Sequence, residues 1–117
     1  MRMWMIDPKL LCRKHLLGEH SEIHKHKHNF LKGHSIKGRI YPITQIEPLS
    51  MQYRHEQLSQ EMLLRKYNHQ SPFEQPSLEK YTPEDINVKV DKNIALKDLS
   101  ERCSECRKRI HENQNNI

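Results

Sequence analysis

The chain has 117 residues, of which 34% are hydrophobic and 30% are charged, so its composition predicts one small domain with a small core. Its 20 lysines and arginines outnumber its 15 acidic residues, and the formal net charge of +5 favours a polyanionic partner such as nucleic acid. No apolar run reaches transmembrane length and the apolar start is too short for a signal peptide, so we expect a cytoplasmic protein without a membrane partner. We also expect a monomer.

The first third of the chain carries the strongest helical pattern. Residues 1–6 are apolar, and we expect them to form an extended arm that packs on the core. A long helix is predicted over residues 8–31, because Asp7 suits the N-cap, Pro8 suits the first helical position and Gly33 suits the C-terminal stop. Apolar residues recur in it every seven positions. The predicted core face comprises Leu16, Ile23 and Phe30.

Beside this core face, the same helical winding gathers a second set of side chains on one arc. This arc comprises Cys12, His15, Glu19, Glu22 and His26. A carboxylate between a core face and a basic face is a candidate for a functional acid with a perturbed pKa. The alternative is that these residues form only the solvated side of the helix, with ordinary pairs at spacings of three and four.

Histidines are also concentrated near the end of this helix. His24, His26 and His28 alternate with lysines, and three alternating residues cannot share one helix face. A metal site built from all three within the helix is therefore not expected, and a helix end that faces a polyanion is favoured. His55, farther along, is interpreted as a hydrogen-bonded histidine at the core edge rather than as a metal ligand.

A second helix is predicted after an irregular connector. Residues 34–48 contain helix-breaking glycine and prolines, and Ser50 then suits the N-cap of a helix that runs to about Tyr67. The inward stripe of this helix comprises Met51, His55, Leu58 and Met62. Arg54 lies near the same face, where it either reaches a phosphate or pairs with Glu19 or Glu61.

The rest of the sequence, from residue 69 onward, predicts a long loop and one more helix. Residues 69–90 contain three prolines and are read as a loop with a short extended piece at its end. A third helix begins near Asn93, and residues 113–117 form a frayed polar tail. The predicted fold is therefore an all-α, compact three-helix domain that spans residues 1–117 and has long irregular connecting loops.

Residues 15–22 read His-Leu-Leu-Gly-Glu-His-Ser-Glu. This segment resembles the His-Leu-Met-Ala-Glu-Tyr-Arg-Glu segment of the pyrimidine dimer DNA glycosylases, the UV-repair enzymes also called endonuclease V. The distance from the amino terminus to Glu22 also fits that family. A weaker resemblance covers residues 54–58 and 66–68, and the C-terminal third shows none.

The resemblance implies a DNA glycosylase with AP-lyase activity, acting on double-stranded DNA with a damaged or abasic site. In this family the α-amine of the first residue is the nucleophile that forms a Schiff base, and the glutamate that matches Glu22 is the acid/base. No cofactor is needed for that chemistry. Because the bulky Arg2 normally blocks removal of the initiator methionine, we predict that Met1 is retained and supplies the amine. An α-amine with an ordinary pKa of about 7.7–8.0 is partly neutral near pH 7, as a nucleophile must be.

The same resemblance suggests DNA-binding residues. Arg2 matches a basic position of the motif, His15 matches the family histidine, and Lys25 stands where relatives carry a phosphate-contacting arginine. Ser21 replaces an arginine of the motif, so we expect cationic compensation from Arg2, Lys25 or Arg54. The family's aromatic, lysine-rich tail is missing here, which leaves the type of lesion open. The alternative functions are a non-catalytic, zinc-stabilised nucleic-acid-binding module and a basic protein-interaction domain.

The cysteines carry an independent signal, since a reducing compartment favours thiols or metal ligands over disulfides. Cys103 and Cys106, followed by Arg-Lys-Arg, resemble a zinc knuckle, and Cys12 and His15 have the same two-residue gap. Together they could form a tetrahedral structural zinc site that ties the last helix to the first. The alternative is that the cysteines are small core residues of a helical seam. If His15 is a metal ligand, it is not free to contact DNA.

Overall fold

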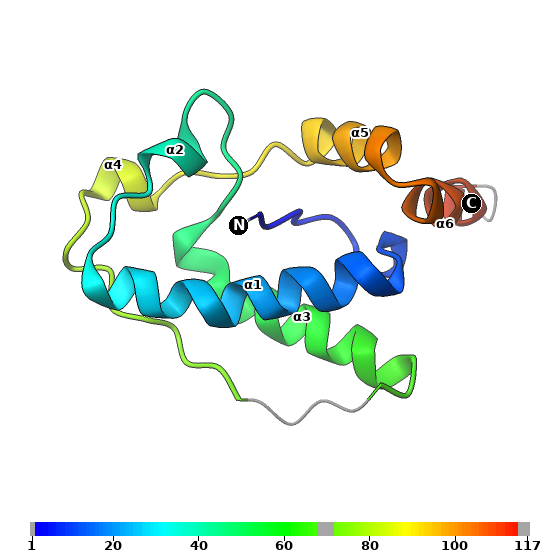
Figure 1. The fold of residues 1–117 in the computed structure, drawn as a ribbon, viewed down its shortest axis with the longest axis horizontal. Helices are drawn as coiled ribbons and strands as arrows, with labels where there is room; N and C mark the ends of the chain where they lie inside the picture. The colour runs from blue at the N-terminus through cyan, green and yellow to red at the C-terminus, as the bar shows by residue number, and fades with distance from the viewer. Residues whose placement is uncertain (1, 68–71, 115–117) are drawn as a thin grey trace.

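The structure, a computed structural model, describes residues 2–67 and 72–114, and within these ranges it is all-α with no strand (Figure 1). The helices are η1 (Pro8–Leu10), α1 (Arg13–Lys32), α2 (Lys37–Ile40), η2 (Pro48–Ser50), α3 (Met51–Leu64), α4 (Pro83–Ile86), α5 (Lys92–Arg102) and α6 (Ser104–Gln114), where η marks 3-10 helices. The all-α prediction is confirmed. The predicted third helix is in fact two, because Cys103 adopts an extended backbone (φ −129°, ψ 113°) between α5 and α6.

The predicted first helix is also divided, and the prediction that it starts at residue 8 is wrong. Asp7 caps η1 rather than α1, by accepting a hydrogen bond from the Lys9 amide at 3.0 Å. Cys12, with an extended backbone, is the N-cap of α1. Gly33 ends α1 in the left-handed conformation (φ 73°), as predicted, where a side chain would be strained. The break after η1 places Cys12 at the start of α1.

The core forms where α1 packs across α3 (Figure 1). The predicted α1 face is buried, and so is the predicted α3 stripe. The buried residues of these two faces are Leu16, Ile23, Phe30, Met51, His55, Leu58 and Met62. At roughly 1.5–3 kcal/mol for each large apolar side chain, this face holds the two long helices together.

The amino-terminal arm adds to this core. Figure 1 shows the arm between α1 and the α5–α6 pair. Met3 is fully buried, and its amide donates to the carbonyl of Gln45 at 2.8 Å. Trp4 is 6% exposed. The expectation of a packed arm is confirmed for residues 2–6.

Two arginines fix η1 against its neighbours. The Arg65 guanidinium, at the end of α3, donates to the carbonyls of Pro8 at 3.1 Å and Leu11 at 2.8 Å. The Arg109 guanidinium, on α6, donates to the Lys9 carbonyl at 2.8 Å. The Lys9 and Leu11 carbonyls gain donors from these arginines, and the Pro8 carbonyl, which already accepts from the Leu11 amide at 3.1 Å, gains a second donor. These bonds also hold the start of α1 beside α6.

The connectors contain more helix than the sequence predicted. The connector over residues 34–48 includes α2, and the loop before α5 includes α4, whose N-cap Thr82 accepts from the Asp85 amide at 3.3 Å. The extended piece expected near residues 87–90 forms no strand. The helix α6 continues to Gln114, so the predicted tail begins later than Asn113, and residues 115–117 lie outside the described residues. None of the described helices combines the length and apolarity needed to cross a membrane.

Candidate functional site

An open pocket of about 450 Å³ lies beside Glu22, where α1 approaches the arm and α5. Its lining includes Arg2, Trp4, Gly18, Glu22, Arg39 and Arg102. The Glu22 side chain is 39% exposed, so the carboxylate can be reached from solvent. The guanidinium groups of Arg39 and Arg102 belong to exposed residues. The pocket therefore combines one accessible carboxylate with cations suited to binding phosphate.

Arg2 is held on the pocket wall by two partners. Its guanidinium donates to Asp98 of α5 at 2.5 Å and lies 4.1 Å from the ring centroid of Trp4. Trp4 in turn meets the imidazole of His15 edge to face at 5.9 Å. Met1, the predicted nucleophile, lies outside the described residues. Its neighbour Arg2 lines the same pocket as Glu22.

Glu22 has an imidazole partner on its own helix. Nε2 of His26 lies 3.5 Å from the Glu22 carboxylate. Burial lowers the pKa of His26, so its ring is neutral at neutral pH. The Asn29 amide nitrogen lies 3.2 Å from Nδ1 of His26, and an amide nitrogen only donates. The His26 ring proton is therefore on Nε2, where it points toward Glu22. The sequence placed His26 on the same arc as Glu22 and interpreted it, with His24 and His28, as part of a helix end that faces a polyanion, but it did not predict the contact with Glu22.

Arg54 lies in the interior rather than at the pocket. Its Nε and Nη2 donate to the two carboxylate oxygens of Glu19 at 2.5 and 2.9 Å, and its Nη1 donates to the Ile6 carbonyl at 2.7 Å. The side chains of Arg54 and Glu19 are 1% and 0% exposed. The sequence left open whether Arg54 contacts a phosphate or pairs with a glutamate. In the structure it pairs with Glu19, and its buried guanidinium cannot reach a phosphate.

The other predicted DNA-binding residues are divided between two places. Arg2 lines the pocket, and Lys25 is exposed on α1, three residues beyond Glu22. His15 faces the cysteines instead, as the alternative interpretation of that residue required. Sequence reasoning did not anticipate Arg39 and Arg102 at the pocket. Arg39 lies in a connector whose path back toward α1 no local pattern predicts, and α5 is distant from α1 along the chain.

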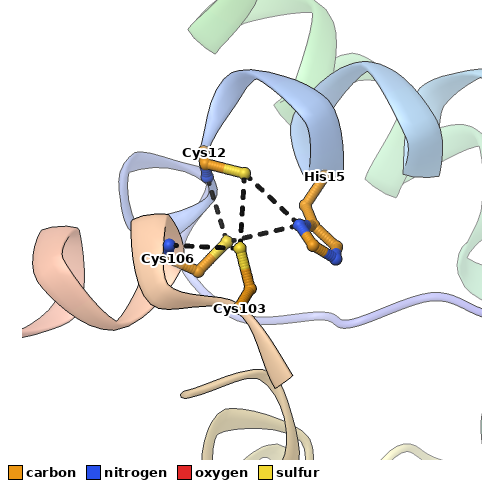
Figure 2. Close-up of side chains that lie close together, drawn as sticks. All are labelled: Cys12, His15, Cys103 and Cys106. Carbon is orange, nitrogen blue, oxygen red and sulfur yellow. Dashed lines mark hydrogen bonds between the residues drawn. The ribbon is translucent and has the colours of Figure 1, made fainter. Parts of the chain in front are cut away.

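A cluster of Cys12, His15, Cys103 and Cys106, hereafter the Cys–His cluster, joins the start of α1 to the α5–α6 junction (Figure 2). One donor atom of each residue lies within 4.8 Å of the others. The Cys12 and Cys103 sulfurs are 3.8 Å apart, and Nδ1 of His15 lies 3.3 and 3.5 Å from the sulfurs of Cys12 and Cys106. A regular zinc tetrahedron has sulfur–sulfur edges of about 3.8 Å and sulfur–nitrogen edges of about 3.5 Å, from its usual bond lengths. The cluster is thus compatible with a structural zinc ion.

Backbone amides and burial shift the pKa values of the cluster's side chains in different directions. The Cys106 amide donates to the Cys103 sulfur at 3.4 Å, and the Cys12 amide donates to the Cys106 sulfur at 3.2 Å. Burial acts to raise the pKa of Cys103, but hydrogen bonds from Cys106 and Cys12 outweigh it and lower that pKa. Burial raises the pKa of Cys106 to about 12. Burial, with Lys14 and Arg102, lowers the pKa of His15 and keeps its imidazole neutral, as a metal ligand must be.

Comparison with known proteins adds the family. A family model described as pyrimidine dimer DNA glycosylase matches residues 1–75, which include Arg2, Glu22 and the first half of the Cys–His cluster. No curated protein and no solved structure matches the chain. The match covers more than half of the chain, and its substrate class agrees with the arginine-bordered pocket. The chain therefore belongs to the pyrimidine dimer DNA glycosylase family.

Proposed function

We propose that this protein excises a damaged base from double-stranded DNA and then nicks the strand, with the α-amine of Met1 as nucleophile and Glu22 as acid/base. The observation that carries the proposal is that Arg2 and Glu22 line one pocket in a chain whose family match begins at residue 1. The residue that follows the nucleophile and the catalytic carboxylate therefore share one site. DNA is the substrate of the family.

The proposed reaction needs only these two groups and water. The neutral α-amine attacks C1′ of the damaged nucleotide, the N-glycosidic bond breaks, and the base leaves with the bonding electrons and takes up a proton. Opening of the sugar ring at O4′ gives an iminium between the amine and C1′. Glu22 then removes a proton from C2′, and β-elimination breaks the bond between C3′ and its phosphate oxygen. Water finally hydrolyses the imine and restores the amine.

The surroundings of Glu22 support this assignment. Nε2 of the neutral His26 carries the ring proton 3.5 Å from the carboxylate, so it supports that carboxylate without adding a full charge. The exposed cations Arg39 and Arg102 line the pocket and could bind the phosphates that flank an extruded nucleotide. Asp98 holds Arg2 in place on the wall. One carboxylate for proton transfer and several cations for phosphates are the groups that the reaction requires.

Borohydride trapping on a duplex with one abasic site tests the mechanism. Reduction of the imine should give a covalent protein–DNA adduct, and peptide mapping should place it on Met1. A variant with two residues added before Met1 should form no adduct at that nitrogen. Glu22→Gln should lower excision and nicking by about 10²–10⁴-fold, the usual contribution of a general acid/base. Glu101→Gln, at an exposed position on α5, is the matched control and should keep full activity.

The outcomes separate the alternative functions. An adduct on a lysine, or a Glu22→Gln variant as active as Glu101→Gln, would contradict the mechanism. Salt-dependent binding to DNA without any adduct would instead support the non-catalytic binding module. Duplexes that each carry one lesion, including a pyrimidine dimer, should show which damaged base is excised most rapidly.

We further propose that the Cys–His cluster binds one structural zinc ion. Its four protein donors fill a tetrahedral coordination shell and leave no open position for a substrate, which is the arrangement of structural zinc sites. The ion would fix α6 to the start of α1, and it takes no part in the chemistry at Glu22. Elemental analysis of the purified protein should find zinc, and Cys103→Ser should remove one equivalent of it.

A further inference from the structure

Three histidine side chains converge where α1 packs on α3, and neither the Glu22 pocket nor the Cys–His cluster includes them. His20 and His24 are one helical turn apart on α1, and His55 comes from α3. One ring nitrogen of each lies within 4.8 Å of the other two. Nε2 of His24 and Nε2 of His55 are 3.0 Å apart. We call these residues the histidine trio.

The spacing within the trio is close to that of ligands around one ion. The three pairs of ring centroids are 4.6 to 4.9 Å apart. Two nitrogens bound to one tetrahedral zinc ion, at bonds of about 2.0–2.1 Å, lie about 3.3–3.4 Å from each other. Small side-chain rotations would therefore bring the nitrogens to bonding distance. His20 and His24, one turn apart on α1, and His55 from α3 approach the ion from two helices, which would fix its position.

The groups around the trio favour metal binding. Nδ1 of His55 lies 3.2 Å from the carboxylate of Glu56, so that nitrogen donates its proton to Glu56 and leaves the Nε2 lone pair directed at the trio. Phe73 stacks on His55 at 5.2 Å and meets His24 edge to face at 5.4 Å. His55 is 1% exposed. A carboxylate behind one ligand and an apolar ring over two of them orient the imidazoles and limit competition from bulk water.

We propose that His20, His24 and His55 form a second metal site, which binds a divalent transition ion of the zinc type. Neutral imidazoles suit zinc, cobalt, nickel or copper, whereas magnesium and calcium require oxygen donors. Water or another donor completes the coordination. The bound ion links α1 to α3 near the middle of α1. This site differs in donor chemistry from the Cys–His cluster and does not depend on the proposed glycosylase mechanism.

Cobalt titration of metal-free protein distinguishes the two sites, because only thiolate ligands give an intense sulfur-to-cobalt charge-transfer band. The wild type should bind two equivalents of cobalt. His20→Gln and His24→Gln should each bind one equivalent and keep the full thiolate band. Cys103→Ser should also bind one equivalent but lose most of that band. His28→Gln, which changes an exposed histidine on the same helix, should bind two.

A variant of a residue behind one ligand tests the histidine trio without changing any of the three ligands. Glu56→Gln, at an exposed residue, should weaken binding at the trio by about 10–100-fold, the usual effect of removing a partner behind a metal ligand. Wild-type protein that binds a single equivalent and shows the full thiolate band would overturn the proposal. So would His24→Gln protein that still binds two equivalents. The full thiolate band in His20→Gln and His24→Gln shows that these variants are folded, so a lost equivalent reports the site itself.

Discussion

The guanidinium of Arg54 and the carboxylate of Glu19 form a buried two-point ion pair that joins α3 to α1. Glu19 lies between His15 of the Cys–His cluster and Glu22 of the pocket along α1. Both partners are almost completely shielded from water, and Arg54 also donates to the Ile6 carbonyl of the arm. The pair therefore determines how α1, α3 and the arm meet.

Breaking this pair should be strongly destabilising. Arg54→Ala leaves the Glu19 carboxylate buried without its partner, so we expect the free energy of unfolding in urea to fall by about 3–5 kcal/mol. Arg102→Ala is the control, because the Arg102–Asp98 pair is exposed and spaced i,i+4, and its loss should cost only about 0.3–0.5 kcal/mol. Equal losses in the two variants would contradict the role of the buried pair.

His26 should act on catalysis through Glu22. His26→Ala removes the Nε2 donor but leaves the carboxylate, so we expect base excision to slow by up to about 10²-fold, as misplacement of a catalytic group does. His26→Gln retains a donor and should recover part of the rate. Single-turnover kinetics on a lesion-bearing duplex measures both. A His26→Ala variant with the wild-type rate would show that Glu22 needs no such support.

Gly18 offers a stabilising change at the pocket. Apart from the local backbone of its own helix, a Cβ atom added there meets no atom within 4 Å, and alanine stabilises a helix interior by about 0.8–1.0 kcal/mol relative to glycine. Gly18→Ala should therefore raise the unfolding midpoint. It should also keep the excision rate, because the family segment that this helix resembles carries alanine at the corresponding position. Loss of activity with gained stability would mean that the substrate itself occupies the space beside Gly18.

Removal of zinc should loosen the carboxyl-terminal helices. Zinc at a free concentration 1,000 times its dissociation constant stabilises the folded state by about 4.1 kcal/mol, and a chelator should abolish this stabilisation. Trp4, the single tryptophan, contacts the His15 ring, so its fluorescence should change as the metal leaves. Cys103→Ser should behave like the chelated protein, and Ser104→Ala should not. A melting temperature that the chelator leaves unchanged would contradict a structural role for zinc.

Acid should destabilise the metal-free protein through two histidines. Burial is the main cause that lowers the pKa values of His15 and His26 in the folded state below the ordinary value of 6.5. Between the lowered value and 6.5 the unfolded chain binds more protons, so the free energy of unfolding rises with pH in that window. The stability that these two neutral histidines contribute is fully present above pH 6.5. It is lost as the pH falls through their lowered folded-state pKa values. Urea unfolding from pH 7.5 to 5 should show a shallower loss in His26→Gln than in His28→Gln.

Several features followed from the sequence because they depend on local periodicity. Leu16, Ile23 and Phe30 are buried as predicted, since a spacing of seven keeps residues on one face of a helix. The CxxC spacing of Cys103 and Cys106 anticipated the cluster. The resemblance to the family could be recognised because its motif is contiguous in sequence, and the family match over residues 1–75 confirms it.

Other features depend on contacts between distant segments, which a single sequence does not reveal. Arg54 fitted a phosphate contact as well as an ion pair, and only the packing of α1 on α3 decides for Glu19. His24 and His55 are 31 positions apart, so the histidine trio has no local motif. The start of α1 was misplaced because Asp7 and Pro8 begin a 3-10 turn as readily as an α-helix.

The Cys–His cluster joins a part of the chain that matches the family to a part that lies beyond the match. Cys12 and His15 lie within the segment that matches the family, and Cys103 and Cys106 lie beyond it. The helix that leads to those two cysteines carries Asp98, the residue that anchors Arg2 at the pocket. A molecule synthesised during zinc starvation would thus have a repair pocket with one unsupported wall.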